Sequence, residues 1–177
     1  MRLQYHDLLI RNAAAADADQ LCIWWNDGRV MAHAGFPNGL GTTAEEIAES
    51  LAADNDDTRR RLLIEYQGRP IGEMSYRMTA PDTAEIGIKI CDFSMQKKGL
   101  GKQLLSMLCK ALFARGCARI ILETNLENRR AQHVYERLGF QKKGVRYDCW
   151  EDQLGRLQSA VDYELTRDTF VDFAAEA

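Results

Sequence analysis

Hydrophobic positions in this chain follow two spacings, one typical of strands and one typical of helices. Alternation or short apolar runs predict strands at residues 7–11, 61–66, 71–78, 84–90, 119–125, 141–150 and 157–166. Recurrence every three or four residues predicts helices near residues 13–25, 43–51, 100–115 and 131–138. Residues 33–41 hold three glycines and Pro37, which indicates a loop.

This order of elements indicates an α/β class of fold. An antiparallel meander that leads into strand–helix–strand implies one mixed sheet with helices on both faces. In the strand at 84–90 the isoleucines alternate, so Glu85, Gly87 and Lys89 share the opposite face. The run Ile120–Leu122 suggests a strand buried on both faces. No linker, repeat or composition shift divides the chain, so we expect a single domain over residues 1–177.

Composition narrows the class of protein. With 46% hydrophobic residues in a chain of 177, one core can form without a disulfide or metal. Apolar runs are far shorter than the ~20 residues that span a bilayer, and no signal-peptide pattern opens the chain, so we expect a cytoplasmic protein without a membrane partner. Five cysteines without a CxxC pair indicate reduced thiols, and three scattered histidines predict no metal site. A net charge of −3 argues against nucleic acid as a partner.

A glycine-rich loop, Gln96-Lys97-Lys98-Gly99-Leu100-Gly101-Lys102, separates the strand at 84–90 from the next helix. Two glycines let a ligand approach the backbone, and the free N–H groups of a helix start favour an anion such as phosphate. A tight turn with solvated lysines would show the same residues. The Walker pattern is absent, and Leu104 takes the third glycine position of a dinucleotide fingerprint.

With this loop the chain resembles the GNAT family of N-acetyltransferases, whose signature is Gln/Arg-x-x-Gly-x-Gly/Ala at a helix start. The resemblance continues in Leu122-Glu123-Thr124-Asn125 and in Asn128-x-x-Ala131-x-x-x-Tyr135-x-x-x-Gly139-Phe140. It covers residues 61–166 by motif and the first 60 by element order. The Trp24-Trp25-Asn26-Asp27 segment is similar to the branch with ribosomal-protein N-terminal and aminoglycoside acetyltransferases.

The resemblance implies acetyl-CoA as co-substrate, held where a parallel pair of strands splays within a mostly antiparallel sheet. The implied cofactor-binding residues are Ile88, Ile90 and Cys91 on the splayed strand, Gln96, Lys97, Lys98, Gly99, Leu100, Gly101 and Lys102 in the loop, and Asn128 and Tyr135 on the second cofactor helix. Asn128 could instead be only an N-cap, and Tyr135 only a core residue.

Three side chains are candidates for catalysis. The resemblance implies Tyr135 as the acid that protonates the departing thiolate, and Glu123 as the base that deprotonates the amine. Glu85 is the alternative base, and a reaction without a side-chain base is also open. Glu123 interrupts an apolar strand, so a purely structural hydrogen-bonding role would explain it as well.

The implied acceptor pocket lies between the first two helices and the last two strands. Its candidate residues are Trp25, Asp27, His33, Phe36, Tyr147 and Trp150. Adjacent tryptophans cannot share a helix face, so we expect one in the core and the other at a cleft. We expect an amine-bearing small molecule or peptide as substrate, and a homodimer is possible. Two alternatives stay open, namely transfer of a longer acyl group and a non-catalytic acyl-CoA sensor or partner-binding module.

Overall fold

The computed structural model describes residues 1–175. Its strands are β1 (Arg2–Tyr5), β2 (Leu8–Asn12), β3 (Arg59–Tyr66), β4 (Arg69–Ala80), β5 (Thr83–Ile90), β6 (Arg119–Asn125), β7 (Gln141–Glu151) and β8 (Leu157–Thr166). Its α-helices are α1 (Ala18–Trp25), α2 (Gly28–Met31), α3 (Ala44–Ala52), α4 (Leu100–Ala114) and α5 (Arg129–Arg137), with short 3-10 turns η1 (Ala15–Asp17), η2 (Ala32–Ala34) and η3 (Phe93–Met95).

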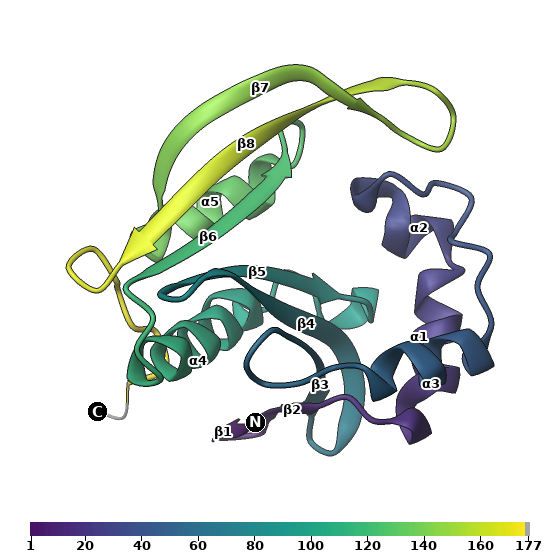
Figure 1. Cartoon of the computed structure of the whole chain (residues 1–177), viewed down its shortest axis with the longest axis horizontal. Helices are drawn as coiled ribbons and strands as arrows, with labels where there is room; N and C mark the ends of the chain where they lie inside the picture. Colours follow the sequence, from purple (N-terminus) through teal and green to yellow (C-terminus); the bar gives the residue numbers. More distant parts are fainter. Residues whose placement is uncertain (176–177) are drawn as a thin grey trace.

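The strands form one mixed sheet in the order β1-β2-β3-β4-β5-β6-β8-β7. Neighbours are antiparallel except β5 and β6, which run parallel because helix α4 connects them as a crossover. Pairing between β5 and β6 covers Thr83–Glu85 and Arg119–Ile121, after which the strands diverge (Figure 1). The sheet therefore opens on one side, at the carboxyl ends of β5 and β6.

Helices cover both faces of the sheet, as the element order predicts. Leu62 and Ile64 of β3 point into a core with α4 and α5, whereas Leu63 points into a second core with α1 and α3. The alternation follows from the period of two along a strand. Trp24 is buried in the second core.

Three sequence predictions needed correction. Strand β1 was not predicted, because its alternating residues are only half-buried or exposed and give a weak pattern. The expected loop at 33–41 begins within a helical turn, since η2 continues to Ala34 and has Gly35 as its C-cap. Strand β6 is buried on one face rather than two, and Glu123 is exposed instead of buried.

Within the described residues, no helix is long and apolar enough to cross a membrane.

Candidate active site

A large cleft occupies the opening between β5 and β6 and has a volume of about 1200 Å³. Helices α1 and α2 bound it on one side, and α5 and the β7–β8 hairpin bound it on the other (Figure 1). The predicted site residues that line it are Trp25, His33, Phe36, Ile88, Ile90, Gln96, Gly101, Glu123, Asn128, Tyr135 and Trp150. The fold thus brings most predicted residues into one cavity.

The edge of β5 that faces this cleft carries backbone groups without a strand partner within residues 1–175. The Cys91 N–H donates to the Ile71 carbonyl on β4 at 2.8 Å, so its neighbour Ile90 turns its backbone to the other edge. Because the backbone groups of successive residues point to alternate edges of a strand, those of Ile88 also face the opening. An extended amide chain could bind these groups as an added strand would.

The glycine-rich loop sits at one end of the cleft, directly before α4. Lys97 and Gly99 have φ of 61° and 78°, a left-handed backbone that turns successive N–H groups toward one side. Gly101 lines the cleft, and a Cβ there would meet open space. Together with the N-terminus of a 15-residue helix, these N–H groups suit a phosphate-bearing ligand.

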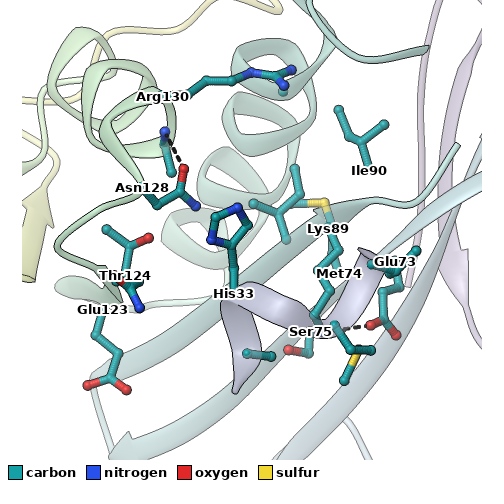
Figure 2. Close-up of a pocket in the computed structure, with 18 of the residues that line it drawn as sticks. His33, Glu73, Met74, Ser75, Lys89, Ile90, Glu123, Thr124, Asn128 and Arg130 are labelled. Atoms are coloured by element: carbon teal, nitrogen blue, oxygen red, sulfur yellow. Dashed lines mark hydrogen bonds and ion pairs between the residues drawn. The ribbon is translucent and has the colours of Figure 1, made fainter. Parts of the chain in front are cut away.

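One side chain joins the loop to α5, and another caps that helix beside the cleft. The Gln96 side-chain amide donates to the Ile90 carbonyl and accepts from Arg130, both at 2.9 Å. Asn128 caps α5 by accepting from the Ala131 N–H at 3.2 Å, the contact drawn in Figure 2. The cap uses only the oxygen of Asn128, so its amide N–H groups stay available to a ligand.

Tyr135 packs against Phe140 and Tyr163, with ring centroids 5.8 and 5.9 Å away. Burial raises the pKa of Tyr135 to about 12. Its hydroxyl has no hydrogen-bond partner among residues 1–175, although the side chain lines the cleft. Tyr135 therefore presents a protonated phenol to the cavity.

Glu123 lines the cleft from β6, and its side chain is 53% exposed. It forms an ion pair with Arg146 of β7, which also binds Asp162 of β8 at 2.8 Å. The hydrogen bond to Asp162 raises the pKa of Arg146 most, and the hydrogen bond to Glu123 raises it further. Glu123 is therefore neither buried nor unpaired, so it does not carry the free-energy cost of an unpaired buried charge.

The structure keeps several predicted residues out of the cleft lining. Glu85 lies where β5 still pairs with β6 and forms an ion pair with Arg77. Cys91 is buried in the core of α1 and α3, and burial raises the pKa of its thiol to about 12. The remaining predicted residues outside the lining are Asp27, Lys97, Lys98, Gly99, Leu100, Lys102 and Tyr147.

Three of these residues outside the cleft lining either contact other side chains or are exposed to solvent. Asp27 caps α2 and pairs with Arg29 at 2.7 Å. The Lys102 ammonium lies 4.7 Å from the centre of the Phe173 ring. Tyr147 is 73% exposed on β7.

A buried carboxylate that the sequence analysis missed lies at the floor of the cleft. Glu73 of β4 is 7% exposed and accepts from the Trp25 indole N–H at 3.0 Å and from the Lys89 ammonium at 2.9 Å. Glu73 and Lys89 are direct cross-strand partners. The alternation of side chains along β5 predicts that Lys89 points away from the isoleucines. The register between β4 and β5 is needed to identify Glu73 as its partner.

The roof of the cleft comes from segments far apart in the sequence. Gln153, in the β7–β8 turn, donates to the Gly39 carbonyl at 3.0 Å and accepts from the Asn38 N–H at 2.9 Å. The Trp150 ring packs directly on Gly35. The hairpin is therefore attached to the loop after η2 and covers the part of the cavity that Trp25, Phe36 and Trp150 line.

Comparison with known proteins agrees with this fold and cleft. The family model described as "Acetyltransferase (GNAT) domain" matches residues 7–141, so the chain belongs to the GNAT acetyltransferase family. No curated protein matches the sequence.

Solved structures with the same fold include acetyltransferases that were crystallised with CoA. One is a spermidine N-acetyltransferase from Vibrio cholerae in complex with CoA and spermine, with a TM-score of 0.80 and 22% identity, over 93% of this chain and 98% of that one. Another is a ribosomal L7/L12 α-N-protein acetyltransferase in complex with CoA, with a TM-score of 0.83 and 19% identity, over 96% and 99%. A further solved structure with the same fold is a ribosomal-protein-alanine N-acetyltransferase from Brucella melitensis, with a TM-score of 0.75 and 22% identity, over 89% of this chain and 98% of that one.

Proposed function

We propose that this protein is an N-acetyltransferase that moves an acetyl group from acetyl-CoA to a primary amine. The observation that carries the proposal is the meeting, in one cleft, of a free strand edge, an anion-binding loop and a protonated phenol. These parts match the needs of a ligand that combines an amide arm, phosphates and a thioester.

The residues fit acetyl-CoA at each part of the cleft. Backbone groups of Ile88 and Ile90 would bind the pantetheine amides, and N–H groups of the loop from Lys98 to Lys102 would hold the pyrophosphate. The Asn128 amide would donate to the pantetheine while its oxygen caps α5. Arg130 adds positive charge beside this path.

The co-substrate supplies an activated acetyl thioester, and the chain supplies orientation and proton transfer. A backbone N–H on the free edge of β5 stabilises negative charge that develops on the carbonyl oxygen. Glu123 accepts a proton from the amine, directly or through water, and Tyr135 donates its proton to the departing sulfur. One C–N bond forms, one C–S bond breaks, and no oxidant or reductant is needed.

We assign the base role to Glu123 rather than Glu85, because Glu85 lies outside the cleft and pairs with Arg77. Figure 2 shows Glu123 and Glu73 on opposite sides of the cleft. Glu73 is already bound by Lys89 and Trp25, which leaves Glu123 as the more accessible carboxylate.

Thiol release with a thiol-reactive dye tests the proposal, with the protein, acetyl-CoA and a panel of primary amines. We expect amine-dependent release of CoA together with thermal stabilisation by acetyl-CoA alone. Stabilisation without release from any amine would indicate a non-catalytic acyl-CoA-binding protein. Faster release from succinyl-CoA than from acetyl-CoA would indicate transfer of a longer acyl group.

A further inference from the structure

The charges that line the cleft are unevenly distributed. Within residues 1–175 the lining contains three carboxylates against six arginine and lysine side chains. The carboxylates are Glu73, Glu123 and Glu127, and the cations are Arg29, Arg61, Lys89, Arg129, Arg130 and Arg146. Arg129 and Arg130 begin α5 on the cofactor side, and Glu127 lies just before its N-cap, which leaves Glu73 and Glu123 for the acceptor half.

Both of these acceptor-side carboxylates are paired with cations. Glu73 is held by Lys89 at 2.9 Å and by the Trp25 indole, and only 9% of its side chain is exposed. Glu123 is held by Arg146, which forms a second ion pair with Asp162. Glu123 is half-exposed and serves the reacting amine as base, so a second ammonium group on the acceptor would have to displace Lys89 from Glu73 or stay unpaired in the cleft.

Apolar and aromatic side chains form much of the acceptor half, beside the cations Arg29 and Arg61. Its walls are formed by Trp25 of α1, Val30 of α2, Phe36 and Leu40 of the following loop, and Trp150 of β7. The Gln153 contacts close the roof between these walls. Such walls favour an apolar body over a peptide backbone, whose amide groups would lose hydrogen bonds with water.

We infer that the acceptor is a small primary monoamine with an apolar or aromatic body, and that the Lys89–Glu73 ion pair excludes polycationic amines. The inference rests on the proposed function, because it names the acceptor of that reaction. Lys89 has a specific part in it: its ammonium neutralises the one deeply buried carboxylate in the acceptor half, Glu73. Removal of the Lys89 charge would leave that carboxylate free to bind a second ammonium.

The sharpest test compares n-hexylamine with 1,6-diaminohexane, which has the same chain and a second ammonium. We expect kcat/KM for n-hexylamine to be at least about 10-fold higher, with 2-phenylethylamine also preferred over spermidine and over a short peptide. Equal or greater kcat/KM for the diamine, for spermidine or for the peptide would overturn the inference. Absence of thiol release from every amine would overturn the proposed function instead.

Two variants test the role of Lys89. In Lys89→Met the preference for n-hexylamine over the diamine should shrink to about 3-fold or less, because the Glu73 carboxylate becomes available. The double variant Glu73→Gln with Lys89→Met has no free carboxylate, so the preference should return. This double variant also controls for misfolding, since it removes both charges of the pair. An unchanged preference in Lys89→Met would refute the role of the ion pair.

Discussion

At the scale of single residues, the environment of Tyr135 determines how its phenol can act. Its ring lies among Phe140 and Tyr163, and burial raises its pKa to about 12. The hydroxyl therefore stays protonated across the working pH range, so it can donate its proton to the sulfur as the C–S bond breaks and negative charge develops there.

Tyr135→Phe should lower kcat by about 100-fold or more and leave the affinity for acetyl-CoA nearly unchanged, because it removes a proton donor and keeps the ring. Steady-state kinetics and calorimetric titration measure the two quantities. An unchanged kcat would remove Tyr135 from the mechanism.

The same pKa sets an expectation for pH. The folded state holds the Tyr135 proton more tightly than the unfolded state, whose tyrosine has the ordinary pKa of about 10. This contribution to stability is complete below pH 10 and is lost as pH rises toward about 12. The free energy of unfolding should therefore fall more steeply over this window in the wild type than in Tyr135→Phe. Parallel curves from urea denaturation would contradict the assigned pKa.

At the scale of elements, the loops and caps around the cleft depend on a few backbone positions. Gly99 has φ of 78° at the start of α4, where an L-residue costs roughly 1–2 kcal/mol. Gly35 has φ of 94° at the end of η2, and a Cβ there would lie 2.5 Å from the Trp150 ring. Gly99 lets the glycine-rich loop take its left-handed conformation before α4. Gly35 leaves room for the Trp150 ring over the cleft.

Gly99→Ala should weaken acetyl-CoA binding about 5-fold or more, because about 1 kcal/mol of strain opposes the loop conformation. Gly116→Ala is the matched control, since Gly116 also has a positive φ, of 102°, and space for a Cβ, but lies outside the cleft lining. Equal affinities of the two variants in calorimetric titration would show that the left-handed backbone at Gly99 does not position the ligand.

Gly35→Ala should raise the KM for the amine several-fold without a change in acetyl-CoA affinity, because it displaces Trp150 from the acceptor wall. Gly41→Ala provides the control, since Gly41 has φ of 71° but no neighbour that a Cβ would meet. A similar KM in both variants would assign the effect to backbone strain rather than to Trp150.

The ion pair between Asp54 and Arg61 joins the end of α3 to strand β3. The Asp54 side chain is 1% exposed and accepts from the Arg61 guanidinium at 2.8 Å. Burial alone would raise the pKa of Asp54, but the bonds from Arg61 outweigh it and lower that pKa. Asp54→Asn should lower the free energy of unfolding by about 3 kcal/mol in urea denaturation. Asp57→Asn, at a 97% exposed side chain, should change it little, and equal losses would contradict the account.

At the scale of the whole molecule, sequence periodicity predicted every strand except β1 and all the longer helices. The resemblance to the GNAT family singled out Gln96, Gly101, Asn128 and Tyr135, and all four line the cleft, because such motifs carry local backbone geometry. The acceptor side was less predictable, since it depends on contacts across the fold. The Glu73–Lys89 pair requires the β4–β5 register, and the Gln153 contacts with residues 38 and 39 join segments more than 110 residues apart.

We propose that this cleft transfers acetyl from acetyl-CoA to an amine. The most direct measurement is mass spectrometry of the amine after incubation with the protein and acetyl-CoA labelled with ¹³C in the acetyl group. We expect a labelled acetamide product of n-hexylamine that forms with the wild type and about 100-fold more slowly with Tyr135→Phe. Binding of acetyl-CoA without any labelled amide, across monoamines, polyamines and peptides, would contradict it.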